Sequence, residues 1–256
     1  KTKVKVHRTK QNKMYYIEEH QLPSFLCDSN DRMTIWGLAQ MLQEVAQGHT
    51  SKSRVGYFEL MKEHKAWVLT KMYFQVHEMP YIGERIKLRT WARDFDGLYA
   101  RRETELIGED GKVKVGVTAY WVVINFNTRK VVRLNDIMAD FEHHPEKATD
   151  RDTIAKLKCP AMDDKDLVNT INISNSMIDH TSHVNNAEYV KWICDNLPGA
   201  DQSVHNPIQE FEIHFQTETH RGETCKIYKH AESDTDFYFK IDNNRSTSIL
   251  AKVTTK

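Results

Sequence analysis

The chain has 256 residues, and its 36 basic and 36 acidic side chains give a formal net charge of zero. A chain of this length usually forms two hydrophobic cores, and a neutral chain has no overall field that attracts nucleic acid or an anionic membrane. The longest wholly apolar run, residues 119–124, is far shorter than the roughly 18 residues expected of a membrane span. The composition therefore predicts a two-part protein with no nucleic acid partner and no membrane span.

The amino end and the cysteines bear on the cellular compartment. The segment KTKVKVHRTKQNKMYY lacks the apolar core of a secretion signal, and no transit peptide is visible, so a cytoplasmic location is expected. The four cysteines show no C-x-x-C spacing: Cys27, Cys159, Cys194 and Cys225. That spacing argues against a structural zinc site and a disulfide framework, and it predicts reduced thiols.

An amphipathic helix is predicted between residues 28 and 49. Four apolar residues follow the i, i+3, i+4, i+7 spacing of a helix that buries one face: Leu38, Met41, Leu42 and Val45. Asp31 and Thr34 are both suitable to cap its amino end.

Strand-like stretches follow this helix. They cover residues 66–77, 85–93, 99–107 and 112–125. In the second stretch apolar and polar residues alternate, as they do in a sheet with one solvated face. The turn sequence GEDGK separates the last two stretches and predicts a hairpin.

The same order recurs after residue 165. A strand-like stretch at 166–174 precedes a second helical stripe, formed by Val190, Ile193, Cys194 and Leu197 and ended by Leu-Pro-Gly. Further strands are predicted at 210–218, 224–233 and 236–253, the last with a turn at Asn243 and Asn244. The repeat predicts an α+β fold with two sheets, each wrapped on a central helix. The first half covers residues 1–137 and the second half covers residues 166–256. The crossover linker between them, residues 138–165, is charged and is expected to hold at least one helical turn.

A polar segment immediately before the second helix is the candidate reaction centre. Asp179, Thr181 and His183 alternate, so their side chains converge on one side of an extended chain. His183 precedes a helix amino end, where free N–H groups stabilise negative charge, and Glu218, expected at the end of a strand, is suited to face the same cleft. A carboxylate and an imidazole that bind the same water are the usual catalytic groups of a hydrolase that works by general-base catalysis. The alternative is a structural turn in which Asp179 or Thr181 caps the chain.

The two halves differ at this segment. Laying Asp28 over Asp179 places Arg32 opposite His183, so the acid recurs and the imidazole does not. If the segment is catalytic, only the second half can use it, and the first half is free to hold substrate.

The segment DHTSHVNNAEYVKWICDNLP resembles the D-x-N-x-H-V-N-N-x-x-Y-x-x-W sequence of the acyl-acyl carrier protein thioesterases, which end fatty acid synthesis in plastids and some bacteria. The stretches LQEVAQGH, AWVLTKMYFQVHEMPYIGERIKLRTWA, RRE and YWVVIN also match in order, so the similarity covers residues 12–256. The resemblance implies a tandem double hotdog, in which each half is a curved antiparallel sheet around a long central helix. It also implies hydrolysis of the thioester between a fatty acyl chain and the phosphopantetheine of acyl carrier protein.

The resemblance also implies roles for individual residues. The family's catalytic aspartate, histidine and glutamate fall on Asp179, His183 and Glu218, whereas its asparagine is replaced by Thr181, a shorter hydrogen-bonding group. A cysteine nucleophile once proposed for the family would stand where this chain has Thr219. Direct attack by water is therefore expected, with Glu218 and His183 deprotonating the water and Asp179 orienting the site.

Binding roles follow from the same resemblance. Backbone N–H groups near Asn185 and Asn186 are expected to stabilise the oxyanion. The first helix is expected to lie along the acyl tunnel with Leu38, Met41, Leu42 and Val45, although helical spacing alone favours an ordinary core for these residues.

Partners are expected as follows. The substrate is acyl carrier protein bearing a fatty acyl chain. Because that carrier is acidic, a basic patch that binds it is expected. The candidates are Arg85, Lys87, Arg89, Arg93, Arg101 and Arg102, although a solvated strand face is an equally good interpretation of these residues. No cofactor is expected, because the substrate carries the phosphopantetheine, and no metal is expected either. Association into a homodimer stays open.

Alternatives from other classes remain. An acyl-CoA thioesterase would share every site residue named, and a non-catalytic acyl-binding hotdog protein would keep the pocket. A hotdog dehydratase is disfavoured, because its H-F-P-type signature is absent.

Overall fold

The computed structural model describes residues 15–51, 53–199 and 207–256. Within these ranges the strands form one eleven-stranded antiparallel sheet in the order β1-β3-β4-β5-β2-β8-β11-β10-β9-β7, with β6 paired to β5. The first-half strands are β1 (Tyr16–Gln21), β2 (Lys65–Val76), β3 (Arg85–Phe95), β4 (Ala100–Ile107), β5 (Val113–Asn125) and β6 (Lys130–Val132). The second-half strands are β7 (Leu167–Asn172), β8 (Ile208–Phe215), β9 (Thr224–Ala231), β10 (Asp236–Asp242) and β11 (Thr247–Thr255).

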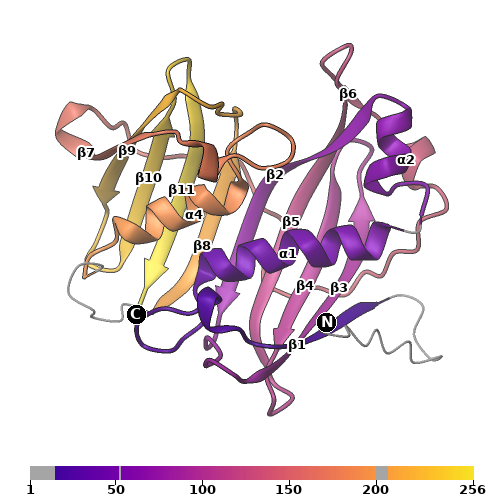
Figure 1. Ribbon diagram of the computed structural model, residues 1–256, viewed down its shortest axis with the longest axis horizontal. Helices are drawn as coiled ribbons and strands as arrows, with labels where there is room; N and C mark the ends of the chain where they lie inside the picture. Colours follow the sequence, from indigo (N-terminus) through magenta and orange to yellow (C-terminus); the bar gives the residue numbers. More distant parts are fainter. Residues whose placement is uncertain (1–14, 52, 200–206) are drawn as a thin grey trace.

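Two helices lie on the same face of the sheet, α1 (Ile35–Thr50) over first-half strands and α4 (Asn186–Asp195) over second-half strands (Figure 1). Thr34 caps α1, because its Oγ1 accepts a hydrogen bond from the Gly37 N–H at 3.0 Å. The short elements are α2 (Tyr57–Lys62), α3 (Asn135–Met138) and the 3₁₀ turns η1 (Ser24–Leu26), η2 (Asp164–Asp166) and η3 (Asn175–Met177). Among the described helices, none has the length and apolar character needed to cross a bilayer.

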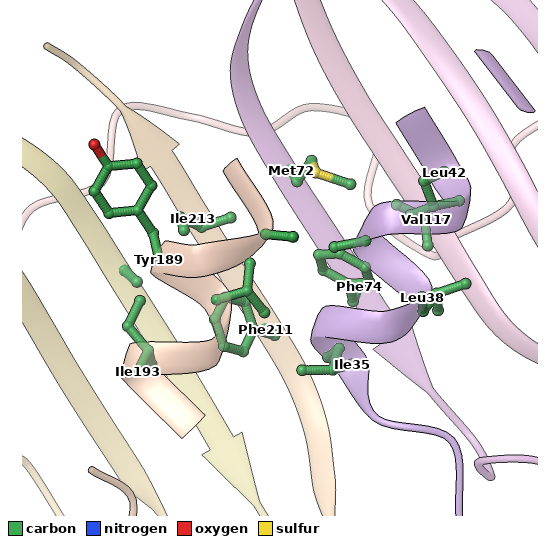
Figure 2. Close-up of a cluster of buried hydrophobic side chains, with 14 of the residues drawn as sticks. Ile35, Leu38, Leu42, Met72, Phe74, Val117, Tyr189, Ile193, Phe211 and Ile213 are labelled. Carbon is green, nitrogen blue, oxygen red and sulfur yellow. The ribbon is translucent and has the colours of Figure 1, made fainter. Parts of the chain in front are cut away.

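The predicted arrangement of a helix on an antiparallel sheet, repeated twice, is confirmed, but the two sheets are continuous. β2 pairs with β8 in antiparallel register from Lys71↔His214 to Gln75↔Glu210. Within this seam Phe74 and Phe211 are register partners, and their rings meet edge to face under the helices, with centroids 6.0 Å apart (Figure 2). The joining of the two sheets was not predicted from the sequence, because strand pairing across more than a hundred residues leaves no local pattern.

The predicted secondary structure agrees closely with the structure. β4 and β5 pair as the expected hairpin. β10 and β11 flank the predicted turn, in which the Asn243 N–H donates to the Ser246 carbonyl at 2.9 Å. One difference bears on the site: β8 ends at Phe215, so Glu218 lies in the loop that follows the strand rather than at its end.

The crossover linker lies on the face of the sheet opposite the helices. Buried Ile154 packs with Tyr73 and Tyr120, whose side chains alternate with strand residues that face the helices. On β5 the linker comes so near that a Cβ at Gly116 would lie 1.9 Å from the Ala148 carbonyl oxygen. The helical turn expected in the linker is η2, at its carboxyl end.

Candidate active site

Residues 179–183 form a tight turn immediately before α4. The Asp179 N–H donates to the His183 carbonyl at 2.9 Å, which closes the turn. One Asp179 oxygen, Oδ1, accepts from the Thr181 N–H at 2.8 Å and from the Thr181 hydroxyl at 2.6 Å. Ser182 takes the left-handed φ of 70° that this reversal requires. The turn is therefore held by hydrogen bonds within five residues, and Asp179 acts as its anchor.

The first half contains the same turn with different chemistry. Asp28 Oδ1 accepts from the Asn30 N–H at 2.9 Å and from the Arg32 N–H at 3.0 Å, while Asp31 takes a φ of 60°. The Arg32 guanidinium lies over the ring of Tyr81, 4.4 Å from its centroid. A guanidinium offers no lone pair for a proton, so the general-base arrangement exists in the second half alone.

The hydrogen bonds define the tautomer of His183. Thr181 has one hydroxyl proton, and the 2.6 Å contact assigns it to the Asp179 carboxylate. The 3.2 Å contact between Thr181 Oγ1 and His183 Nδ1 then requires Nδ1–H to be the donor. In the neutral imidazole Nε2 then carries the lone pair, and it lies 3.2 Å from Glu218 Oε2. Thr181, which stands where the family has asparagine, can therefore orient the imidazole.

Glu218 reaches His183 because the loop after β8 is tied to the turn. The Val184 N–H donates to the Thr219 carbonyl at 2.9 Å, which joins the two segments directly. Arg245 Nη2 donates to the Glu218 carbonyl at 2.6 Å and holds the loop from its other side. The structure thus brings together all four predicted catalytic residues. Glu218 lies 35 residues or more after the other three in the sequence.

A cavity of about 300 Å³ opens at this cluster. Asp179, Thr181, His183 and Glu218 line one end of it. Much of the remaining wall is apolar and comes from both halves: Ala46, Val55, Leu60, Trp67, Trp121, Met138, Phe141, Tyr189 and Phe215. A pocket of this size, apolar with a few polar groups at one end, suits a ligand with a long apolar part and one reactive group.

The predicted acyl-binding residues of α1 do not line this cavity. Leu38 and Val45 are fully buried in the core, and Met41 packs against it (Figure 2 shows Leu38 and Leu42). Leu42 lines only a second pocket of about 20 Å³. The cavity instead meets another face of α1, at Gln43, Ala46, Gln47 and Thr50. The sequence missed that face because its mixed polarity carries no helical signal.

The expected basic patch is largely neutralised. Arg85, Lys87, Arg89, Arg93 and Arg101 each form an ion pair with a neighbouring carboxylate. Arg102 faces the interior, where it lines the cavity and donates to His49 Nδ1 at 2.9 Å. Burial lowers the pKa of Arg102 to about 10 and that of His49 to about 3. The prediction of a basic patch was therefore wrong for Arg102 and for Arg93, which is buried with Glu103, and the other four side chains form ion pairs along the strands.

The two asparagines at the start of α4 have different roles. The Asn185 N–H donates to the Met177 carbonyl at 2.9 Å, and its Oδ1 caps the helix by accepting from the Ala187 N–H at 2.9 Å. Asn186 lines the cavity, and its N–H has no hydrogen-bond acceptor within the described residues. Of the two, only the Asn186 N–H is free to meet a developing oxyanion.

The residue after Glu218 presents no nucleophile to the cavity. Thr219 is fully buried, with its Oγ1 3.0 Å from Ser248 Oγ, and it does not line the cavity. Burial raises the pKa of the nearby Cys225 thiol to about 11, so little thiolate is present at neutral pH. The geometry agrees with attack by water.

Substitution of Thr219 tests this point. Thr219→Ala is expected to keep kcat within about threefold of the native value, and the lost buried hydrogen bond is expected to cost about 1 kcal/mol of the free energy of unfolding. Turnover assays and denaturant unfolding measure the two effects. A variant that unfolds normally and has lost hundredfold or more in kcat would assign Thr219 a chemical role.

Comparison with known proteins identifies the family. The model of the acyl-ACP thioesterase N-terminal domain matches residues 13–141, and that of the C-terminal domain matches residues 161–256. The oleoyl-acyl carrier protein thioesterase 1 of Arabidopsis thaliana is 25% identical over 218 residues, which are 79% of this chain and 60% of the relative.

Solved structures show the same fold. An acyl-ACP thioesterase from Bacteroides thetaiotaomicron aligns with a TM-score of 0.79 and 24% identity, covering 94% of this chain and 98% of the other. A 12:0-ACP thioesterase from Umbellularia californica aligns with a TM-score of 0.84 and 17% identity, covering 97% of this chain and 99% of the other. With both domain models matched in order along one double-hotdog chain, the protein belongs to the acyl-ACP thioesterase family.

Proposed function

We propose that the protein hydrolyses fatty acyl-ACP thioesters, which releases free fatty acid and ends chain elongation. The observation that carries the proposal is the His183–Glu218 pair, 3.2 Å apart, at one end of an apolar cavity. Family membership supports the reaction class, and the cavity supports a long apolar acyl chain.

In the proposed reaction, a water between Glu218 and His183 attacks the thioester carbonyl. The pair takes the proton of the water, while Asp179 and Thr181 keep the imidazole oriented with Nε2 toward the reaction. The Asn186 N–H donates a hydrogen bond to the tetrahedral oxyanion, and the positive end of the α4 dipole stabilises the same negative charge. Collapse of this intermediate breaks the C–S bond, and the thiol of phosphopantetheine leaves with the proton. A thioester is an activated acyl donor, so the proposal needs no cofactor.

The acyl chain is proposed to lie in the cavity along α1, which makes Ala46 a determinant of chain length. Ala46→Phe is expected to lower kcat/KM for the longest accepted acyl chain by about tenfold or more, because the added ring fills space otherwise occupied by methylenes. Met41→Phe is the matched control, since Met41 lies on the same helix but not at the cavity wall. Assay of each variant on a ladder of chain lengths measures the preference. An unchanged preference in Ala46→Phe, or a shift in Met41→Phe alone, would contradict this placement.

The carrier distinguishes the two closest candidate functions. A panel of acyl-ACP and acyl-CoA thioesters of equal chain length, tested with the native protein and Glu218→Ala, is expected to show a higher kcat/KM for acyl-ACP. Equal or faster hydrolysis of acyl-CoA would favour an acyl-CoA thioesterase. Absence of hydrolysis on every thioester would favour the non-catalytic acyl-binding protein. The cytoplasmic location and the homodimer stay predictions from the sequence.

A further inference from the structure

The loop after β8 brings a second imidazole to the His183–Glu218 pair. The rings of His220 and His183 have their centroids 4.9 Å apart. One ligand atom from each of His183, Glu218 and His220 lies within 4.8 Å of the other two. The backbone holds His220 in place, since its N–H donates to Glu223 Oε2 at 2.7 Å. The hydrolysis proposed above has no use for this third group.

The three side chains meet as hydrogen-bond acceptors when the imidazoles are neutral and the carboxylate is ionised. Nε2 of His183 is an acceptor, because Nδ1–H donates to Thr181. An ionised Glu218 is also an acceptor, so the 3.2 Å contact between them joins two acceptors unless a proton or a cation lies between. The ring of His220 forms no hydrogen bond within the described parts of the chain, which leaves its unprotonated nitrogen available. A proton on the imidazole or a bound cation can therefore occupy this contact, and the third ligand makes a cation the case to test.

We propose that His183, Glu218 and His220 bind a divalent cation of the zinc class, and that the bound ion stops hydrolysis. Two imidazoles and one carboxylate, with a fourth position open to water, form a ligand set that zinc prefers. Ligands about 2.0–2.2 Å from a tetrahedral zinc lie about 3.3–3.6 Å from each other, close to the 3.2 Å between His183 Nε2 and Glu218 Oε2. His220 supplies the third ligand, since its ligand atom lies within 4.8 Å of the other two.

Inhibition follows from the position of the ion. A zinc ion would take the lone pairs of His183 and Glu218, the same groups that deprotonate the attacking water in the proposed function. The inhibitory part of the inference therefore rests on that function, whereas the binding part does not.

The repeat predicts one ion per chain. The Met33 N–H donates to the Pro80 carbonyl at 2.9 Å just as the Val184 N–H donates to that of Thr219, so the two loops correspond. Met79 and Tyr81 then occupy the positions of Glu218 and His220, and Arg32 that of His183. These side chains do not form a zinc site, because an arginine stands where the first imidazole is required.

Binding is measured without reference to turnover. The metal-stripped full chain is titrated with Zn²⁺ against a chromophoric chelator, and with Co²⁺ while visible absorption is recorded. We expect one ion per chain, a four-coordinate Co²⁺ spectrum, and affinity lowered about tenfold or more in His220→Ala. His180→Ala is the matched control, because His180 lines the same cavity but lies outside the cluster. Equal affinity in His220→Ala and the native chain, or no binding, would overturn the site.

Turnover tests the inhibitory part. Zinc is expected to inhibit acyl-ACP hydrolysis by the native chain, a chelator to restore it, and His220→Ala to need about tenfold more zinc or more. Equal zinc sensitivity in the two, or a higher rate with zinc, would overturn inhibition through this site. A chain that binds zinc as described but hydrolyses no thioester would retain the metal site and refute the proposed function.

Discussion

Glu218→Ala is expected to lower kcat for acyl-ACP hydrolysis by about 10²–10⁴-fold, and His183→Ala by a similar factor. The reason is that the two side chains lie 3.2 Å apart and together accept the proton of the attacking water in the proposed reaction. Because they act as one unit, the double variant is expected to lose little more than either single variant. Steady-state kinetics on purified acyl-ACP substrates measures all three.

Glu188→Ala serves as the control for this experiment. Glu188 lies in the first turn of α4, near the reaction centre, but it does not line the cavity. Its replacement leaves the general base intact, so kcat should stay within about threefold of the native value. A fully active Glu218→Ala protein with unchanged thermal unfolding would refute the water mechanism.

Glu103→Leu is expected to lower the free energy of unfolding by about 3–5 kcal/mol. Glu103 is fully buried, and its Oε1 lies 2.8 Å from Nη1 of the equally buried Arg93, in an ion pair rather than an aligned hydrogen bond. Its Oε2 accepts from the Thr118 hydroxyl at 2.7 Å and from the Ala148 N–H at 3.1 Å, which attaches the linker to the sheet. Leucine would remove the closer carboxylate of the buried guanidinium and leave it with Asp94 Oδ2, 3.4 Å from its Nε. Denaturant unfolding of the variant measures the loss.

The double variant Arg93→Met/Glu103→Leu separates two contributions to the lost free energy of unfolding, the broken charge pair and the lost packing. Removing both charges is expected to recover most of the stability, because no buried charge is left without a partner. If the double variant is as unstable as Glu103→Leu, the loss of the carboxylate beside Arg93 is not the cause.

The same carboxyl gives a pH dependence whose sign follows from its pKa. Burial raises the pKa of Glu103 from 4.5 to about 7. Between these values the folded state holds one proton more than the unfolded state, so the contribution of Glu103 to the free energy of unfolding falls as pH rises from about 4.5 to about 7. Glu103→Gln removes the titration, and its stability is expected to change less over that range. A Glu103→Gln protein with the same pH dependence as the native chain would assign the titration to another group.

Features set by short-range physics could be predicted from the sequence. The apolar stripe of Leu38 and Val45 reports a helix that buries one face, and strand alternation reports a sheet with one covered face. The turn from Asp179 to His183 is also local, because its hydrogen bonds join residues at most four apart. The repeat of that turn at Asp28 could be found by comparing the chain with itself.

Tertiary structure alone decided how these pieces meet. The approach of Glu218 to His183 depends on the bond between Val184 and Thr219, and the seam of β2 and β8 joins strands more than a hundred residues apart. The cavity is the space left between packed elements, so its wall at Ala46 follows no periodic pattern. Periodicity and local hydrogen bonds act over a few residues, and they determine the elements of this protein. The cavity, the inward-facing side chain of Arg102 and the position of His220 depend on contacts between distant segments, which no local pattern encodes.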